Sequence, residues 1–407
     1  MLLGLVVALV VFVERDADVV VPDPPKAAPS ESPVPREAGA AELLDELEAA
    51  LSDGSRKRVL SLAAPDEPTA RRELRAIHGN VGNLGATDLD FRFIAADAGR
   101  VTPADRRTFG ARAWVADVEV AWRVADFDTG TSRMEVALTL VDTPDGVAFG
   151  SARGEYDTPV PLWLLDELAV GQSRRALVAV AGDEDLDRYA TLADQAVRDV
   201  RAVLPSWRGR LVVEIPADDD QLHRLMDVDP GTYDSIAAVT ATVDGSGDPD
   251  SPAHILINPG VFQGLGDDGS QIVMSHEATH IAVDAATSTM PLWLLEGFAD
   301  YVALARSELP VSVTASQILA EVRRSGPPRR LPGPDEFDPS NKLLGTSYEA
   351  AWLACRLMAE EYGERRLIRF YRTVDEGQSL AEAFALLGTT EAAFTRQWRN
   401  YLRELAG

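Results

Sequence analysis

Hydrophobic residues in the first half of this chain recur with two different periods. From residue 40 to about residue 75, leucines repeat at the spacing of a helix face, and Pro65 and Pro68 interrupt the pattern. Apolar and polar residues then alternate, which is typical of half-buried strands, and Asp145-Gly146 marks a turn. The strands expected from this pattern are 112–124, 134–141 and 147–149.

The second half begins with short apolar runs and continues with long helical ones. The expected order is strand, helix and three strands, followed by a helix over 271–283 and a largely helical remainder. The strands and helix that precede 271–283 are expected at 176–180, 186–204, 211–216, 236–243 and 254–257. The fold class is therefore α+β, with one domain over residues 40–170 and a second over residues 175–407.

The N-terminus does not fit either domain. Residues 1–13 are apolar but too few to span a bilayer, which takes about 20 residues. They are interpreted as a membrane anchor or the remnant of a signal segment, with a frayed apolar tail or an interfacial helix as the alternative. Residues 14–39 are rich in proline and predict an extended linker.

Composition excludes some classes of partner. The net charge of −26 argues against nucleic acid and against electrostatic attraction to an anionic membrane. The single cysteine, Cys355, excludes an intrachain disulfide and lies in an apolar run typical of a buried thiol.

The segment 274–280 has the sequence Met-Ser-His-Glu-Ala-Thr-His, an H-E-x-x-H motif in a chain with five histidines. On a helix, His276 and His280 lie on one face and can hold one zinc ion (Zn2+). Glu277 then lies beside the metal, where it can act as a general base on water. The motif predicts metal-assisted hydrolysis, most often of a peptide bond.

A third ligand is expected in the helix that follows Pro291. Glu296 lies in a strongly apolar stretch, where a carboxylate is costly unless it is paired or metal-bound. Asp300, four residues later on the same face, has the spacing of an acceptor for the free N–H of a ligand histidine. His254 has two interpretations, a residue that lines a cleft or a strand-end histidine.

The H-E-x-x-H motif followed by W-L-x-E-G-x-A-D-Y (residues 293–301) resembles the gluzincin metallopeptidases, and most closely the bacterial peptidase MA-like metallohydrolases, distant relatives of aminopeptidase N and thermolysin. This resemblance implies that His276, His280 and Glu296 bind zinc. It also implies that Glu277 is the general base and that Asp300 orients the first histidine. The connection between His280 and Glu296 is shorter than in the larger aminopeptidases, and residues 284–289 must close it without a glycine.

Tyr348 lies in a segment that resembles the Y-x-x-G element of aminopeptidase N relatives, with Ala351 in place of the glycine. The resemblance implies that its hydroxyl donates to the oxyanion of the transition state. The resemblance to the gluzincin family as a whole covers roughly residues 175–405. It implies a zincin-like domain with a small sheet, an active-site helix and a helical C-terminal subdomain. The first domain is similar to a cone-shaped nuclear transport factor two-like fold in element order alone.

The sequence thus predicts a bacterial zinc metallopeptidase that acts on a peptide or protein outside the cytoplasm, anchored through its N-terminal apolar segment. The absence of a G-x-M-E-N-type element weakly favours an endopeptidase. One alternative is a zinc-stabilised module that binds peptides without cleaving them. Another is that the N-terminal domain carries the main function and the peptidase domain regulates it. Oligomeric state and substrate are not determined by the sequence.

Overall fold

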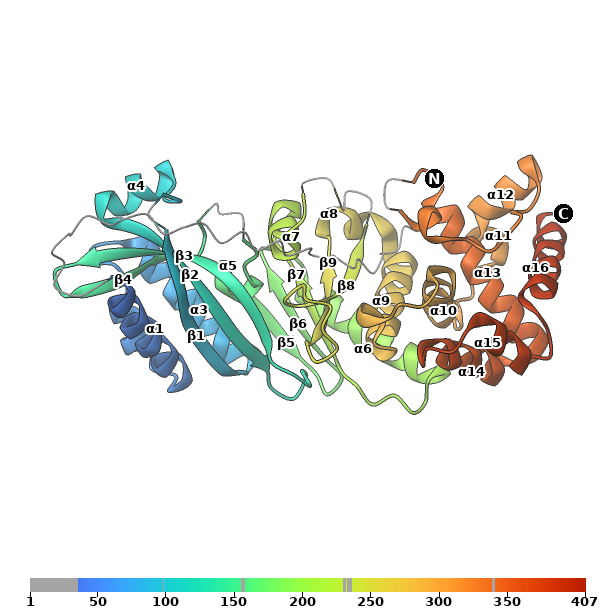
Figure 1. Ribbon diagram of the computed structural model, residues 1–407, viewed down its shortest axis with the longest axis horizontal. Helices are drawn as coiled ribbons and strands as arrows, with labels where there is room; N and C mark the ends of the chain where they lie inside the picture. Colours follow the sequence, from blue (N-terminus) through green and yellow to red (C-terminus); the bar gives the residue numbers. More distant parts are fainter. Residues whose placement is uncertain (1–35, 98, 155–157, 230–231, 233–235, 339–340) are drawn as a thin grey trace.

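The computed structural model describes residues 36–97, 99–154, 158–229, 232, 236–338 and 341–407. It is a mixed α+β structure with two sheets and a helical C-terminal part, arranged in that order along its longest axis (Figure 1). None of the described helices is long and apolar enough to cross a membrane. The apolar segment 1–13 and the expected linker up to residue 35 lie outside the described residues.

The first sheet is an antiparallel meander of four strands, with α1 and α3 packed against it (Figure 1). Its strands are β1 (Ala86–Asp97), β2 (Ala113–Val124), β3 (Ser132–Thr143) and β4 (Gly146–Ser151). Its helical segments are α1 (Arg36–Ser52), α2 (Arg56–Ser61), α3 (Pro68–Leu84), α4 (Pro103–Phe109), η1 (Gly110–Arg112) and α5 (Leu162–Leu165). The three expected strands are confirmed.

Two features of this region differ from expectation. Helix α1 begins at Arg36, inside the segment expected to be linker. Its Gly39 packs so closely on β4 that an added Cβ would lie 2.7 Å from Val147 Cγ2. Strand β1 was not expected from the sequence pattern. Most of its residues are exposed, and two register shifts interrupt the alternation of apolar and polar positions.

The second sheet has the strand order β5-β6-β7-β9-β8 and mixes parallel and antiparallel pairs. Its strands are β5 (Leu168–Gln172), β6 (Ala176–Ala181), β7 (Leu211–Ile215), β8 (Ala238–Thr242) and β9 (Ala253–Ile257). Helix α6 (Leu186–Val203) packs on this sheet, and α7 (Asp219–Met226) follows β7. Strand β5, which was not expected, begins inside the region 40–170 and ends two residues beyond it, and it pairs with β6 of the second sheet.

The remaining chain is helical, as expected. It comprises α8 (Pro259–Phe262), η2 (Gln263–Leu265), α9 (Gly266–Ala282), η3 (Ala285–Thr287), α10 (Leu292–Leu304), α11 (Val311–Thr314), α12 (Ser316–Ser325), η4 (Pro334–Phe337), α13 (Leu344–Tyr362), α14 (Glu364–Asp375), α15 (Leu380–Leu386) and α16 (Glu391–Ala406). Cys355 of α13 is fully buried, and burial raises the pKa of its thiol.

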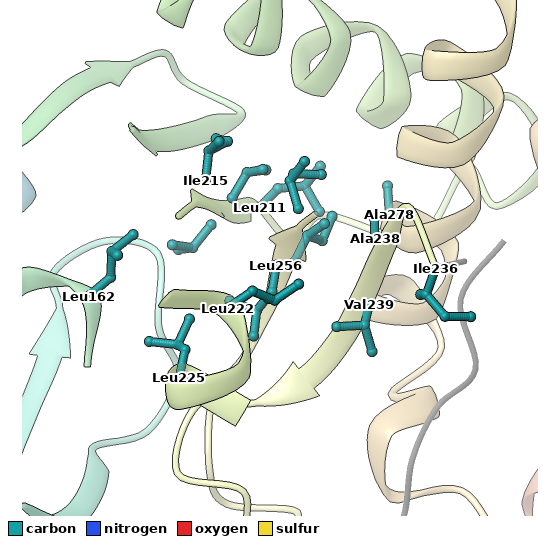
Figure 2. Close-up of a cluster of buried hydrophobic side chains, with 14 of the residues drawn as sticks. Leu162, Leu211, Ile215, Leu222, Leu225, Ile236, Ala238, Val239, Leu256 and Ala278 are labelled. Atoms are coloured by element: carbon teal, nitrogen blue, oxygen red, sulfur yellow. The ribbon is translucent and has the colours of Figure 1, made fainter. Parts of the chain in front are cut away.

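Buried hydrophobic side chains connect the second sheet to the elements around it. Figure 2 shows Leu211 and Ile215 of β7, Leu222 of α7 and Ala278 of α9 in one cluster. Leu162, from the end of the first region, belongs to the same cluster. The two sheets therefore share a continuous core, and α9 is held against the second sheet by burial of apolar surface.

His254 of β9 is buried and connects the two sheets. Its Nδ1 lies 2.6 Å from Glu214 Oε1 on β7, and its Nε2 lies 3.0 Å from Asp128 Oδ1 in the turn between β2 and β3. His254 is the second residue of β9, as the strand-end interpretation expected, and both of its ring nitrogens bind carboxylates inside the protein. Burial opposes the charged imidazole, but Asp128 and Glu214 outweigh it and raise the pKa of His254 to about 10.

We expect His254→Gln to lower the free energy of unfolding by about 3 kcal/mol at pH 6.5, because it leaves two buried carboxylates without their cation. The folded-state pKa of His254 lies above the ordinary value of about 6.5, so its stabilisation is complete below pH 6.5 and is lost as pH rises through 10. Urea unfolding at several pH values measures this difference. The control is His78→Gln, since His78 contacts only the carbonyl of Gly54. A difference that is constant from pH 6.5 to 10 would contradict the prediction.

Candidate metal centre

Helix α9 carries the H-E-x-x-H motif through the interior of the protein, beside the second sheet. Gln271 is half-buried, all residues from Ile272 to His280 are buried, and Ser275 and Thr279 are as buried as their apolar neighbours. The helix begins at Gly266, and Asp267 and Asp268 lie in its first turn. Acidic residues in a first turn favour the helix through its dipole.

A polar contact holds the buried face of α9 against α6. Ser275 donates to Asp199 Oδ2 at 3.0 Å, and Gln195 donates to the other oxygen of Asp199 at 2.7 Å. Because Ser275 precedes His276 directly, this contact restrains the rotation of α9 about its axis. The orientation of the motif histidines therefore depends on α6 as well as on α9.

Helix α10 supplies the carboxylates. Pro291 precedes its first residue, and Glu296 and Asp300 lie one turn apart on its buried face. A Cβ at Gly297 would lie 2.4 Å from the carbonyl oxygen of Ala351 on α13. The glycine after Glu296 is therefore required by the close approach of α10 and α13.

The structure brings His276, His280 and Glu296 together. One ligand atom from each residue lies within 4.8 Å of the others. Glu296 Oε2 is 3.1 Å from His276 Nε2 and 3.3 Å from His280 Nε2. Two imidazole nitrogens and one carboxylate oxygen are the ligand set of several catalytic zinc sites.

Asp300 binds the other side of the first histidine. His276 Nδ1 lies 2.8 Å from Asp300 Oδ1, so Nε2 is the nitrogen directed at Glu296. Burial disfavours a charged imidazole, but Asp300 and Glu296 outweigh it and raise the pKa of His276 to about 10. Burial also opposes ionisation of Glu296, but His280 and His276 hold the pKa of this carboxyl below its ordinary value.

Glu277 is fully buried beside this cluster. Its Oε2 accepts a hydrogen bond from Thr240 of β8 at 2.7 Å, while Oε1 has no partner among the described residues. Burial raises the pKa of Glu277, which suits a group that must both accept and release a proton. Thr240 was missed in the sequence analysis, because an isolated threonine in a strand carries no signal of its neighbour on a distant helix.

Tyr348 of α13 lies beside the metal-binding cluster, near His276. Its ring packs edge-on against Phe337, with centroids 5.3 Å apart, and its centroid lies 6.2 Å from that of His276. Within the described part of the chain, its buried hydroxyl has no hydrogen-bond partner. Burial, with smaller contributions from Glu296, Asp300 and Glu277, raises the pKa of Tyr348 well above its ordinary value and keeps it a donor.

A divalent metal fits these residues. His280 Nδ1 and Glu296 Oε1 are buried without hydrogen bonds to any described residue, and His280 Nε2 lies 3.3 Å from Glu296 Oε2 without forming a hydrogen bond. This arrangement is costly for a site that lacks a further partner. The short connection between the two helices is closed by Asp284, which adopts φ 52° in place of a glycine, and by η3. This turn lets Glu296 return to the two histidines.

Comparisons with known protein families, with curated proteins and with solved structures give no match for this chain.

We expect metal binding to release a proton from His276. The pKa of His276 is about 10 without metal, so the ring is protonated at pH 7 and must become neutral to act as a ligand. The apparent affinity of the protein for Zn2+ should rise about tenfold per pH unit between pH 7 and 9. Calorimetry of Zn2+ binding in buffers with different ionisation enthalpies counts the released protons.

Asp300→Asn is the informative variant for this measurement. It should reduce proton release, because it removes the carboxylate that raises the pKa of His276. It should lower the affinity of the unprotonated site about 10- to 100-fold, because the acceptor that orients the His276 ring is lost. His78→Gln should change neither quantity. Affinity that is independent of pH in the parent would contradict the raised pKa of His276.

Proposed function

We propose that this protein is a zinc-dependent hydrolase of peptide bonds. The observation that carries the proposal is the buried convergence of His276, His280 and Glu296, with the Oε1 of Glu277 and the hydroxyl of Tyr348 unpartnered beside them. A site that only bound metal would have no need of these two additional groups. The architecture proposed with this function is zincin-like, with the second sheet above the metal centre and the C-terminal helices below it.

His276, His280 and Glu296 would hold the metal, and Asp300 would keep His276 in the tautomer that presents Nε2. When bound, zinc supplies Lewis acidity for activating water and for polarising a carbonyl. Glu277 accepts the proton of the attacking water on its free Oε1 and then delivers it to the leaving amine. Thr240 holds the other oxygen of Glu277, so the reacting oxygen is fixed in one direction.

Strand β8 supports a peptide as the substrate. It pairs with β9 on one side, and no other described strand pairs with it. Its Thr240 contacts Glu277 directly, so an extended peptide added to this edge would pass the metal centre. Backbone recognition of this kind suits cleavage within a chain, in agreement with the endopeptidase expected from the sequence. Attachment to a membrane through residues 1–13 and action outside the cytoplasm stay predictions.

Glu277→Gln should retain metal and lose hydrolysis, because the amide keeps the shape of the side chain but cannot accept the proton. Metal content by mass spectrometry and cleavage of a quenched fluorescent peptide library measure the two quantities. Glu296→Ala is the complementary variant and should lose the metal as well. Full activity in Glu277→Gln would sink the mechanism, and zinc-dependent peptide binding without cleavage by the parent would establish the alternative, a peptide-binding module.

Tyr348→Phe should lower kcat about 100-fold with little change in KM, because its hydroxyl would act only on charge that develops in the transition state. Its fold should be unchanged, since the hydroxyl has no partner to lose. Tyr371→Phe is a matched control, because Tyr371 also has a buried hydroxyl without a partner among the described residues, while its ring packs against Phe298. Equal losses in the two variants would contradict the role of Tyr348.

A further inference from the structure

The turn between β2 and β3 of the first sheet reaches across to the second domain and is fixed there. Asp128 in this turn binds His254 through Oδ1, and its Oδ2 accepts the backbone N–H of Val124 at 2.7 Å. Arg210, which precedes β7, donates to the carbonyl of Asp126 at 2.6 Å. Its guanidinium carbon lies 5.5 Å from the ring centroid of Phe127.

A glycine shows how closely this turn packs. A Cβ at Gly130 would lie 2.1 Å from the carbonyl oxygen of Asp250, in the segment between β8 and β9. No side chain fits between the two backbones. Elements around the second sheet thus hold the turn at three places, namely at Asp128, at Asp126 and at Gly130.

This fixed turn forms one wall of a cavity of about 200 Å³ that also contacts the metal centre. Phe127 and Thr129 lie on the wall from the first sheet, Trp207 on the loop before β7, and His280 and Ile281 on α9. His280 therefore contributes both to the metal-binding cluster and to this cavity.

The chemistry of the walls favours an uncharged occupant. Phe127, Trp207 and Ile281 supply aromatic and aliphatic surface, and Thr242 and Ser251 supply hydroxyl groups. The charged residues at the wall besides Asp128 are Arg210 and Asp284, which are opposite in sign. Both oxygens of Asp128 already accept hydrogen bonds, from His254 and from the backbone N–H of Val124. A charged group would lose water there without gaining a free oxygen of Asp128 in exchange.

We propose that this cavity is a substrate subsite that takes one uncharged side chain of a peptide beside His280, and that the turn between β2 and β3 thereby sets specificity. The inference rests on the proposed function, since His280 both lines the cavity and is a proposed metal ligand. It gives the first domain a role as part of the catalytic unit, in contrast to a separate function regulated by the peptidase domain.

The experiment measures the residue preference of the full chain with a peptide library in which one position is varied, for Thr129→Trp and Thr131→Trp. Thr129 lines the cavity and is exposed, so an indole there would obstruct it, while Thr131 lies in the same turn outside the cavity walls. Thr129→Trp should lower kcat/KM for the preferred uncharged residue about tenfold or more and shift the preference to glycine or alanine. Thr131→Trp should retain the parent profile.

Phe127→Ala provides a second, independent variant, because it enlarges the cavity and should shift the preference to larger side chains. Zinc content and melting temperature of every variant are measured with the profile. If Thr129→Trp and Phe127→Ala keep the parent profile while the parent cleaves peptides, the subsite is overturned and the proposed function stands.

A measurement of peptide binding tests the case in which the parent does not cleave peptides. Fluorescence anisotropy with zinc-loaded Glu277→Gln and the same peptides measures selectivity without cleavage. If the parent cleaves nothing, but peptides bind and Thr129→Trp in the Glu277→Gln background abolishes the preference, hydrolysis is overturned and the subsite stands. If zinc-loaded protein neither binds nor cleaves any peptide, both are overturned.

Discussion

The structure from the second sheet onward depends on one constraint, the burial of several ionisable groups at the junction of α9 and α10. His276, Glu296 and Asp300 are enclosed by protein, and each would be costly there alone. They offset this cost by binding one another. Asp300 Oδ1 binds Nδ1 of His276, and Glu296 Oε2 binds its Nε2. The apolar packing of both helices therefore serves to hold a polar cluster in a single geometry, which is what a metal site requires.

The same principle acts a second time, between the two domains. His254 is buried with Asp128 on one side and Glu214 on the other, so the first sheet cannot move away from the second without exposing or unpairing a charge. Together with the backbone contact at Gly130, this ion cluster makes the turn between β2 and β3 a wall of the cavity beside His280. The two clusters lie on neighbouring elements and link the first domain to the proposed chemistry.

Local patterns explain why most elements were predictable. Strands β2, β3 and β4 follow alternation, and α9 and α10 follow continuous apolar runs whose polar interruptions are the motif residues. The elements that escaped prediction are those whose pattern is weak. Strand β1 is mostly exposed and carries two register shifts, and β5 is short and contains Gly171. Their pairing is decided by neighbours distant in sequence.

The sequence by itself determined the α+β class and the H-E-x-x-H spacing on one helix, because periodicity is a local property of the chain. It also singled out Glu296, Asp300 and Tyr348, through resemblance to a family motif. Only the tertiary structure decided that Thr240 binds Glu277, that His254 joins two sheets, and that a turn of the first domain reaches the cavity at His280. These contacts join residues far apart in the chain, and no local pattern encodes which distant backbone will approach.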